Sequence, residues 1–226
     1  MDTPEPSFDA KALSAHGLAC RRGGRMVFEG LDFSVEPGAL LYLRGANGSG
    51  KSTLLRLIAG FVPAADGELM YGDDAWGTGD AALSEAVVYV GHDHGLKPAL
   101  TLRENCQTYA RIMTGKSLSE NVLYDAAETF ALDRLLDQAV RFFSSGQRHR
   151  ASLMRFLLAD RPVWLMDEPT VGLDADNREK LAGLMTRHLA RGGLILAATH
   201  DPIGVAGATV DVSQYAARAT VQEGWL

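Results

Sequence analysis

The segment from Gly45 to Thr53 constrains this chain more than any other feature, because it joins glycines to a lysine that two hydroxyl side chains follow directly. It reads Gly-Ala-Asn-Gly-Ser-Gly-Lys-Ser-Thr, follows the apolar run 40–43 and precedes the leucine-rich stretch 54–59. A strand, a glycine loop, a lysine, a hydroxyl and a helix in this order cradle phosphate groups. Glycines let successive backbone N–H groups turn inward, and the helix that follows adds its positive dipole end. The segment therefore predicts a nucleotide-phosphate site.

Each residue type in this loop suits one part of a nucleotide. Lys51 is expected to reach the β- and γ-phosphates, and Ser52 to place its hydroxyl on Mg²⁺. The other residues expected to line the phosphates are Gly45, Asn47, Gly48, Gly50 and Thr53. The alternative, a glycine-rich turn that binds nothing, is disfavoured because the spacing and both flanking elements agree with a phosphate site.

Composition and charge narrow the class of protein. A chain of 226 residues is long enough for one domain with a substantial core. Its net charge of −6 argues against a nucleic-acid role, since such a surface needs a basic excess. No apolar stretch approaches the length of a membrane-spanning helix, and the acidic, proline-bearing N-terminus is unlike a secretory signal. Cys20 and Cys106 show no metal-binding spacing, so reduced cytosolic thiols are expected.

The apolar patterns predict a mostly parallel α/β domain with a helical insert. Residues 1–11 resemble a disordered tail, and a loop is expected over 72–80. Strands are expected at 13–20, 26–28, 31–35, 39–43, 68–71, 87–90, 163–166 and 194–198. Helices are expected from Ser52, over 102–113 behind a Thr-x-x-Glu cap, and over 119–130, 147–159 and 177–191. We expect one domain over 1–226, with a nucleotide-binding core of 12–91 and 161–226 and a helical subdomain of 92–160.

Two carboxylates, Asp167 and Glu168, end the apolar run 162–166. A buried parallel strand delivers its last residues to the carboxyl edge of the sheet, where ligands bind. Asp167 suits the surroundings of Mg²⁺, and Glu168, which would point elsewhere, could polarise an attacking water. An acidic strand end alone is commonly a turn cap, but together with the glycine loop it favours a catalytic interpretation.

Residues 143–147, Phe-Ser-Ser-Gly-Gln, resemble the Leu-Ser-Gly-Gly-Gln signature of the ATP-binding-cassette (ABC) ATPases. Ser144, Gly146 and Gln147 match the signature, and a small-residue turn that opens a helix can receive a phosphate. On its own such a loop is more often a simple helix cap. Asp174 lies where the family's D-loop belongs, and His200 matches the switch histidine that contacts the γ-phosphate. The resemblance covers residues 13–202.

This resemblance implies an α/β fold, a P-loop NTPase core with an antiparallel β subdomain and an α-helical subdomain insert. It implies ATP and Mg²⁺ as cofactors, hydrolysis of ATP, and catalytic roles for Glu168 and His200. In this family the signature of one chain completes the phosphate site of a second chain. With one cassette per chain, two copies of this protein are expected to sandwich two ATP molecules.

Two positions depart from the usual family pattern. Arg22 stands where most members place an aromatic residue that stacks on adenine, and a guanidinium plane can also stack on a base. His92 stands where most members place a glutamine that senses magnesium and contacts the membrane subunit. Three interpretations stay open for His92: a substitute for that glutamine in catalysis, a metal-binding pair with His94, or a polar loop residue.

The same departures are similar to one subfamily, the haem-export ATPases of cytochrome c biogenesis. The matching stretches are 20–31, 89–92, 95–105 and 190–193, whereas 167–174 follows the general ABC form. The similarity implies a motor that drives release of haem-loaded chaperone, with CcmB and CcmC as partners and a coupling surface around 92–110. Such a subunit lies on the cytoplasmic face of the bacterial inner membrane. The alternatives are the ATPase of a drug or nutrient transporter, or a soluble ABC ATPase such as an Fe–S assembly factor.

Overall fold

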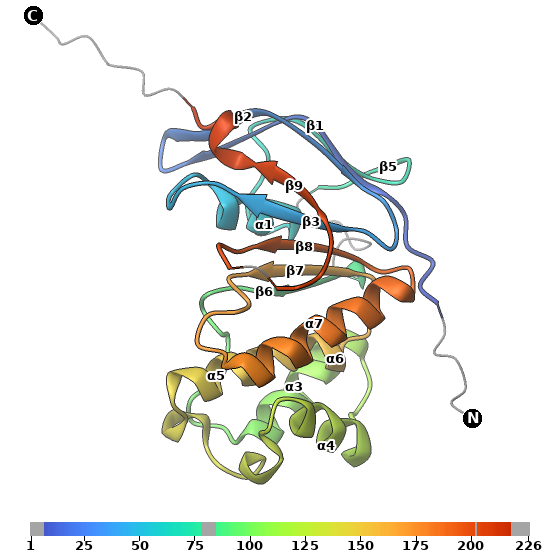
Figure 1. Ribbon diagram of the computed structural model, residues 1–226, viewed down its shortest axis with the longest axis vertical. Coiled ribbons are helices and arrows are strands. Elements are labelled where there is room, and N and C mark those ends of the chain that lie inside the picture. The colour runs from blue at the N-terminus through green and yellow to red at the C-terminus, as the bar shows by residue number, and fades with distance from the viewer. Residues whose placement is uncertain (1–6, 78–84, 202, 218–226) are drawn as a thin grey trace, which may run out of the picture.

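The computed structural model describes residues 7–77, 85–201 and 203–217, and all structural statements below concern these residues. An antiparallel sheet, a parallel sheet and a group of helices are stacked from top to bottom in Figure 1. The two sheets belong to the first and last parts of the chain, and the helices below them come mainly from the middle. This is the α/β arrangement with a helical insert that the sequence predicts.

The antiparallel sheet has the strand order β2-β1-β4-β5. Its strands are β1 (Leu13–Arg22), β2 (Arg25–Val35), β4 (Asp66–Tyr71) and β5 (Asp74–Ala75). The two strands expected at 26–28 and 31–35 are one continuous strand. Gly30 takes a φ of 68° inside it, and three register shifts against β1 absorb the irregularity. β5 lies within the loop expected at 72–80, of which residues 78–80 are outside the described part.

The parallel sheet has the order β6-β7-β8-β3-β9. Its strands are β3 (Leu40–Arg44), β6 (Val87–Val90), β7 (Val163–Asp167), β8 (Leu194–Ala198) and β9 (Ala208–Asp211), the last of which the sequence patterns did not predict. Alternate side chains enter two cores, because successive residues of a strand point to opposite faces. Leu43 and Asp167 both pair with Ala198, so β3, β7 and β8 end at one edge.

Helix α1 (Lys51–Ile58) lies between the two sheets and buries four apolar side chains there. Below the parallel sheet lie α3 (Leu102–Thr114), α4 (Glu120–Thr129), α5 (Ser145–Leu153), α6 (Arg155–Leu158) and α7 (Ala175–Ala190). Short 3₁₀ helices occur at η1 (Asp133–Leu135), η2 (Val140–Phe142) and η3 (Val212–Tyr215). The Thr101–Glu104 capping box at the start of α3 is present as predicted.

One expected helix, 147–159, is instead two helices that meet at Met154. Near this point the Ser152 hydroxyl donates to the His149 carbonyl at 2.6 Å, so a side chain bonds to a backbone carbonyl of α5. At the N-terminus, residues 1–6 of the expected tail lie outside the described part. The Phe8 amide donates to the Arg191 carbonyl at 2.8 Å, and Lys11 pairs with Asp74 at 2.7 Å.

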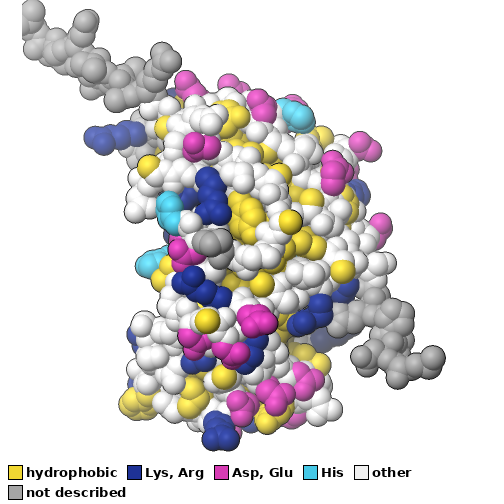
Figure 2. Space-filling model, viewed as in Figure 1, with side chains coloured by type: hydrophobic (Ala, Val, Ile, Leu, Met, Phe, Trp, Pro, Cys, Tyr) yellow, Lys and Arg dark blue, Asp and Glu magenta, His cyan; other side chains and the backbone are white. Residues whose placement is uncertain are grey.

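The surface carries charged side chains of both signs (Figure 2). On the face shown in Figure 2, basic and acidic side chains alternate, and apolar atoms show between them over the sheets. On that face the basic side chains are spread out and do not gather into one patch. Within the described ranges, no helix has both the length and the apolar character needed to cross a bilayer.

Candidate active site

The predicted phosphate loop connects β3 to α1 and has the backbone that only glycine adopts readily. Gly45, Gly48 and Gly50 have φ values of 132°, 83° and 106°. A Cβ on Gly45 would lie 2.5 Å from the Ser213 hydroxyl, and one on Gly50 would lie 2.9 Å from a Val27 methyl. Gly45 and Gly50 therefore leave no room for a side chain, in addition to having a backbone conformation that favours glycine.

The loop is braced by residues near the end of the described chain. The Ala46 amide donates to the Ser213 hydroxyl oxygen at 3.0 Å, and the Ser213 amide donates to Asp211 at 2.9 Å. These two braces come from η3 and β9, which lie beside β3 at the sheet edge. Sequence reasoning missed them because residues 208–215 carry no motif and meet the loop only in the folded chain.

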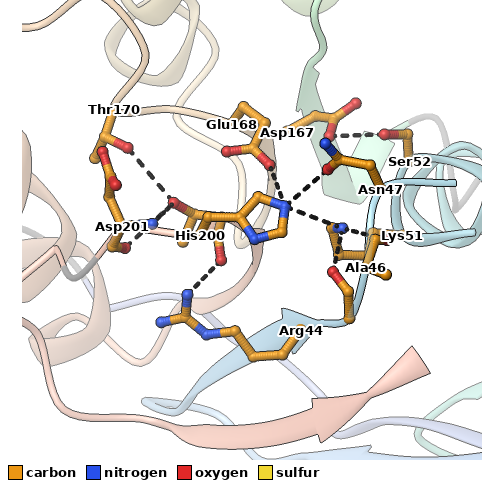
Figure 3. A network of polar contacts seen from close by, with 12 residues as sticks. Arg44, Ala46, Asn47, Lys51, Ser52, Asp167, Glu168, Thr170, His200 and Asp201 are labelled. Atoms are coloured by element: carbon orange, nitrogen blue, oxygen red, sulfur yellow. Dashed lines mark hydrogen bonds and ion pairs between the residues drawn. The ribbon is translucent and has the colours of Figure 1, made fainter. Parts of the chain in front are cut away.

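Lys51 is the first residue of α1 and is 7 % exposed. Its ammonium donates to the carbonyl oxygens of Gly45 at 2.7 Å and Ala46 at 3.1 Å. The same Nζ lies 3.4 Å from Nε2 of His200. The lysine therefore lies across the glycine loop and faces the predicted switch histidine, as Figure 3 shows. Thr53, in the same turn of α1, is half-buried.

Ser52 and Asp167 meet as the sequence predicts for a magnesium site. The Ser52 hydroxyl donates to Oδ1 of Asp167 at 2.9 Å. Burial raises the pKa of the Asp167 carboxyl, and the Ser52 hydrogen bond opposes that rise. A hydroxyl and a carboxylate at this separation offer the hard oxygen ligands that Mg²⁺ takes alongside phosphate oxygens. The residues present therefore fit the ion.

Glu168 and His200 come from neighbouring strand ends and face the glycine loop (Figure 3). Glu168 has a φ of 52°, which is unusual for a residue with a side chain, and its amide donates to the Ala198 carbonyl at 2.8 Å. Nε2 of His200 lies 3.8 Å from the Glu168 carboxylate and 3.1 Å from the Asn47 amide oxygen. Residues from three separate motifs thus converge on one site.

The turn that carries His200 is held by its neighbour Thr199. The Arg44 guanidinium donates to the Thr199 carbonyl, and the Asp201 amide donates to the Thr199 hydroxyl at 3.1 Å. The Thr170 hydroxyl lies 3.4 Å from the Thr199 hydroxyl. Arg44 had no predicted role, because a single basic residue at a strand end is not a recognisable motif.

The predicted signature residues form a helix cap in this chain. Ser144 caps α5, where its amide donates to the Gln147 side chain at 2.8 Å and its hydroxyl accepts from the Gln147 amide at 3.2 Å. Gly146 is half-buried near the Gly172 carbonyl. Asp174 caps α7 and accepts from Asn177, and that bond lowers the pKa of the Asp174 carboxyl. Any contact of these residues with a nucleotide stays a prediction that involves a second chain.

The two departures from the family pattern lie near the site. Arg22 ends β1 and borders a hollow of about 370 Å³, which Arg56 and Tyr89 also line. His92 is exposed in the segment after β6, whereas His94 is half-buried. In the described part of the chain, no cluster of three or more His, Cys, Asp or Glu residues could hold a metal ion. Such a cluster is larger than a pair of residues, so all three interpretations of His92 remain predictions.

Comparisons with known proteins show the family to which the chain belongs. An ABC transporter family model matches residues 28–171. The cytochrome c biogenesis ATP-binding export protein CcmA of Nitrobacter winogradskyi is 45% identical over 195 residues, which cover 86% of this chain and 94% of that protein. The protein of the same name from Bradyrhizobium diazoefficiens is 44% identical, over 85% of this chain and 94% of its own.

Solved structures show the same fold. A putative ABC transporter ATP-binding protein from Pyrococcus furiosus has a TM-score of 0.78 and 20% identity, over 91% of this chain and all of its own. A dimeric ATP-binding cassette bound to ADP and Pi has a TM-score of 0.75 and 22% identity, over 84% of this chain and 88% of its own. The fold and the family resemblance predicted from the motifs are both confirmed. The chain belongs to the ABC transporter family of ATP-binding subunits, and within it to the cytochrome c biogenesis export proteins named CcmA.

Proposed function

We propose that this protein is the ATP-hydrolysing motor subunit of an ABC membrane complex that exports haem, or releases haem-loaded chaperone, for cytochrome c maturation. The observation that carries the proposal is the convergence of Lys51, Glu168 and His200 beside a glycine loop that receives phosphates. The process comes from relatives more than 40% identical whose name is cytochrome c biogenesis ATP-binding export protein. The motif stretches shared with that subfamily support the same assignment.

In this proposal the loop from Gly45 to Thr53 binds the phosphates of ATP through inward-facing backbone amides and the α1 dipole. Lys51 exchanges its two carbonyl contacts for the β- and γ-phosphate oxygens. Glu168 accepts a hydrogen bond from the attacking water and aims it at the γ-phosphorus, where the bond to the bridging oxygen breaks. His200, which faces both Lys51 and Glu168, holds the γ-phosphate in line with that water.

Two residues would hold the cation that accompanies ATP. Ser52 would ligate Mg²⁺ through its hydroxyl, and Asp167 would do so directly or through a water. The ion supplies charge neutralisation at the phosphate oxygens. Burial of Asp167 makes its carboxylate costly without a cation beside it, which fits a role in binding one.

A second copy of the chain is the first proposed partner. Ser144 is exposed at the start of α5, and none of the polar contacts drawn around Lys51 in Figure 3 involves the signature. A signature that faces outward can complete the phosphate site of another chain in a head-to-tail pair. Glu168→Gln should therefore form a stable dimer with Mg-ATP in light scattering. A variant that stays monomeric at saturating Mg-ATP contradicts this part of the proposal.

The second proposed partner is a membrane subunit, CcmB or CcmC, docked at residues 92–110. A small hollow of about 120 Å³ lies there, lined by Leu96, Lys97, Leu100 and Tyr109. Ile112 at its border is 75% exposed, which favours a partner surface. Arg103 nearby has its guanidinium paired with Glu120 and Asp137. Docking would place the protein on the cytoplasmic face of the inner membrane.

Co-expression with CcmB and CcmC tests both the proposed ATP hydrolysis and the proposed docking to a membrane subunit. Lys51→Ala should keep recruitment to the membrane but lose ATP hydrolysis and cytochrome c formation. Lys97→Glu combined with Ile112→Glu should keep basal hydrolysis and lose recruitment. Val122→Glu, at an exposed position on α4, is the matched surface control and should change neither. Normal cytochrome c formation in the Lys51→Ala strain would overturn the assignment in favour of another ABC function.

A further inference from the structure

His149 is a buried histidine that the proposed mechanism does not use. It lies on α5, three residues beyond Gly146 of the signature, and is 6 % exposed. Its Nε2 is 2.9 Å from the carbonyl oxygen of Pro169, the residue that follows Glu168. A carbonyl only accepts hydrogen bonds, so Nε2 carries the hydrogen and donates it. Burial lowers the pKa of His149, which keeps the ring neutral with that one donor.

The backbone around Glu168 needs support from its surroundings. Its left-handed φ of 52° costs a residue with a side chain free energy, and such conformations persist where neighbouring groups hold them. On the sheet side, the Glu168 amide is bonded to the Ala198 carbonyl at 2.8 Å. On the helical side, the adjoining Pro169 carbonyl is bonded to His149. The direction of the Glu168 carboxylate therefore depends on both contacts.

His149 also contacts the segment that follows β6. The ring of His94 lies 5.3 Å from the ring of His149, with an angle of 66° between their planes. This is an edge-to-face arrangement, so the two rings are in direct contact. The adjacent Gly95 carbonyl accepts from Arg155 of α6 at 2.7 Å, so the segment is held against the helices. The coupling surface that the subfamily resemblance implies, around 92–110, begins in this same segment.

We propose that His149 is a positioning residue: its hydrogen bond to Pro169 sets the direction of Glu168, and His94 links that bond to the segment after β6. The proposal rests on the proposed role of Glu168 in orienting water. It gives a physical path by which a partner that moves residues 91–97 changes the rate of hydrolysis. It also ties the signature helix of a chain to the catalytic carboxylate of the same chain.

Substitution of His149 separates positioning from packing. His149→Leu replaces the ring with an apolar side chain of similar size that has no hydrogen-bond donor. The kcat for ATP hydrolysis should therefore fall about tenfold. KM for ATP should stay within about twofold, because the phosphate loop is not touched. His149→Gln carries an amide N–H that reaches the Pro169 carbonyl, and it should restore most of the lost kcat. His94→Ala should lower kcat about threefold, and His94→Phe should restore it.

His188 provides the matched control within the same chain. It is 2% exposed on α7, and its Nε2 lies 3.0 Å from the carbonyl of another proline, Pro162, just before the opposite end of β7. His188→Leu should lower stability in urea as much as His149→Leu does, while kcat stays at the wild-type value. If the two leucine variants lower kcat equally, His149 acts only through packing and the proposal is wrong.

Glu168→Gln measured in parallel keeps the two proposals distinct. If Glu168→Gln is inactive while folded His149→Leu has the wild-type kcat, the positioning role is refuted and the role of Glu168 stands. If Glu168→Gln remains active, the proposed role of Glu168 fails first. Should His149→Leu not fold, His149→Gln and His94→Ala decide. A Gln variant about tenfold slower than the wild type contradicts the hydrogen bond, and an unaffected His94→Ala contradicts the link.

Discussion

Acid should destabilise this protein through His188, and the size of the effect follows from the structure. The imidazole is 2% exposed, donates to Pro162 and stacks on Trp164 with ring centroids 3.8 Å apart. Burial lowers the pKa of His188 from 6.5 to about 4. The folded state therefore binds this proton less tightly than the unfolded state, so stability falls as pH drops from 6.5 towards 4. The full difference corresponds to about 3 kcal/mol, of which about 2 kcal/mol is lost between pH 7 and pH 5.

Urea unfolding of wild type and His188→Gln at pH 7 and pH 5 measures this contribution. The glutamine variant is less stable at pH 7 because it loses the stacking contact, but it has no ring to protonate. The wild type should lose about 2 kcal/mol more than the variant on going to pH 5. The comparison removes the contribution of other buried groups, such as His149, which both proteins share. Equal losses in the two proteins would refute the assignment of this acid sensitivity to His188.

Two further predictions use matched pairs. Gly45→Ala places a Cβ 2.5 Å from the Ser213 hydroxyl and should weaken ATP binding at least about tenfold by calorimetry, whereas Gly24→Ala, in an open hairpin turn, should leave binding unchanged. Equal affinities would show that the loop tolerates a side chain. Ser144→Ala and Ser119→Ala each remove a helix cap and should each cost about 1 kcal/mol in urea unfolding. Only Ser144→Ala should also slow ATP hydrolysis, and equal hydrolysis rates in the pair would argue against the signature role.

The parts of the site that could be predicted are those encoded in contiguous residues. The Gly45–Thr53 loop, the Asp167–Glu168 strand end and His200 each follow an apolar strand, and parallel strands bring such ends to one edge. The order of strands within the sheet, and the continuation of β2 through Gly30, required the folded chain. The break at Met154 lies beside the hydrogen bond from the Ser152 hydroxyl to the His149 carbonyl, and the apolar pattern does not reveal it.

The parts that could not be predicted depend on contacts between distant segments. Ser213 braces an amide 167 positions earlier in the chain, and nothing in the residues around it indicates that contact. No role could be assigned to His149 from the sequence, because it lies outside the signature residues and contacts Pro169 only in the folded chain. Ser144 and Gly146 are proposed to act on a nucleotide bound to a second chain, so their roles depend on the dimer and not on the fold of one chain.

The most direct test of the account mixes two inactive variants. Lys51→Ala damages the phosphate loop, and Ser144→Arg damages the signature that is proposed to act on the other chain. In an equal mixture half of the dimers contain one chain of each kind, and each of these has one complete site, so about a quarter of the wild-type ATP hydrolysis should return. A mixture as inactive as its components would show that Lys51 and Ser144 do not meet across two chains, and would contradict the proposed composite site.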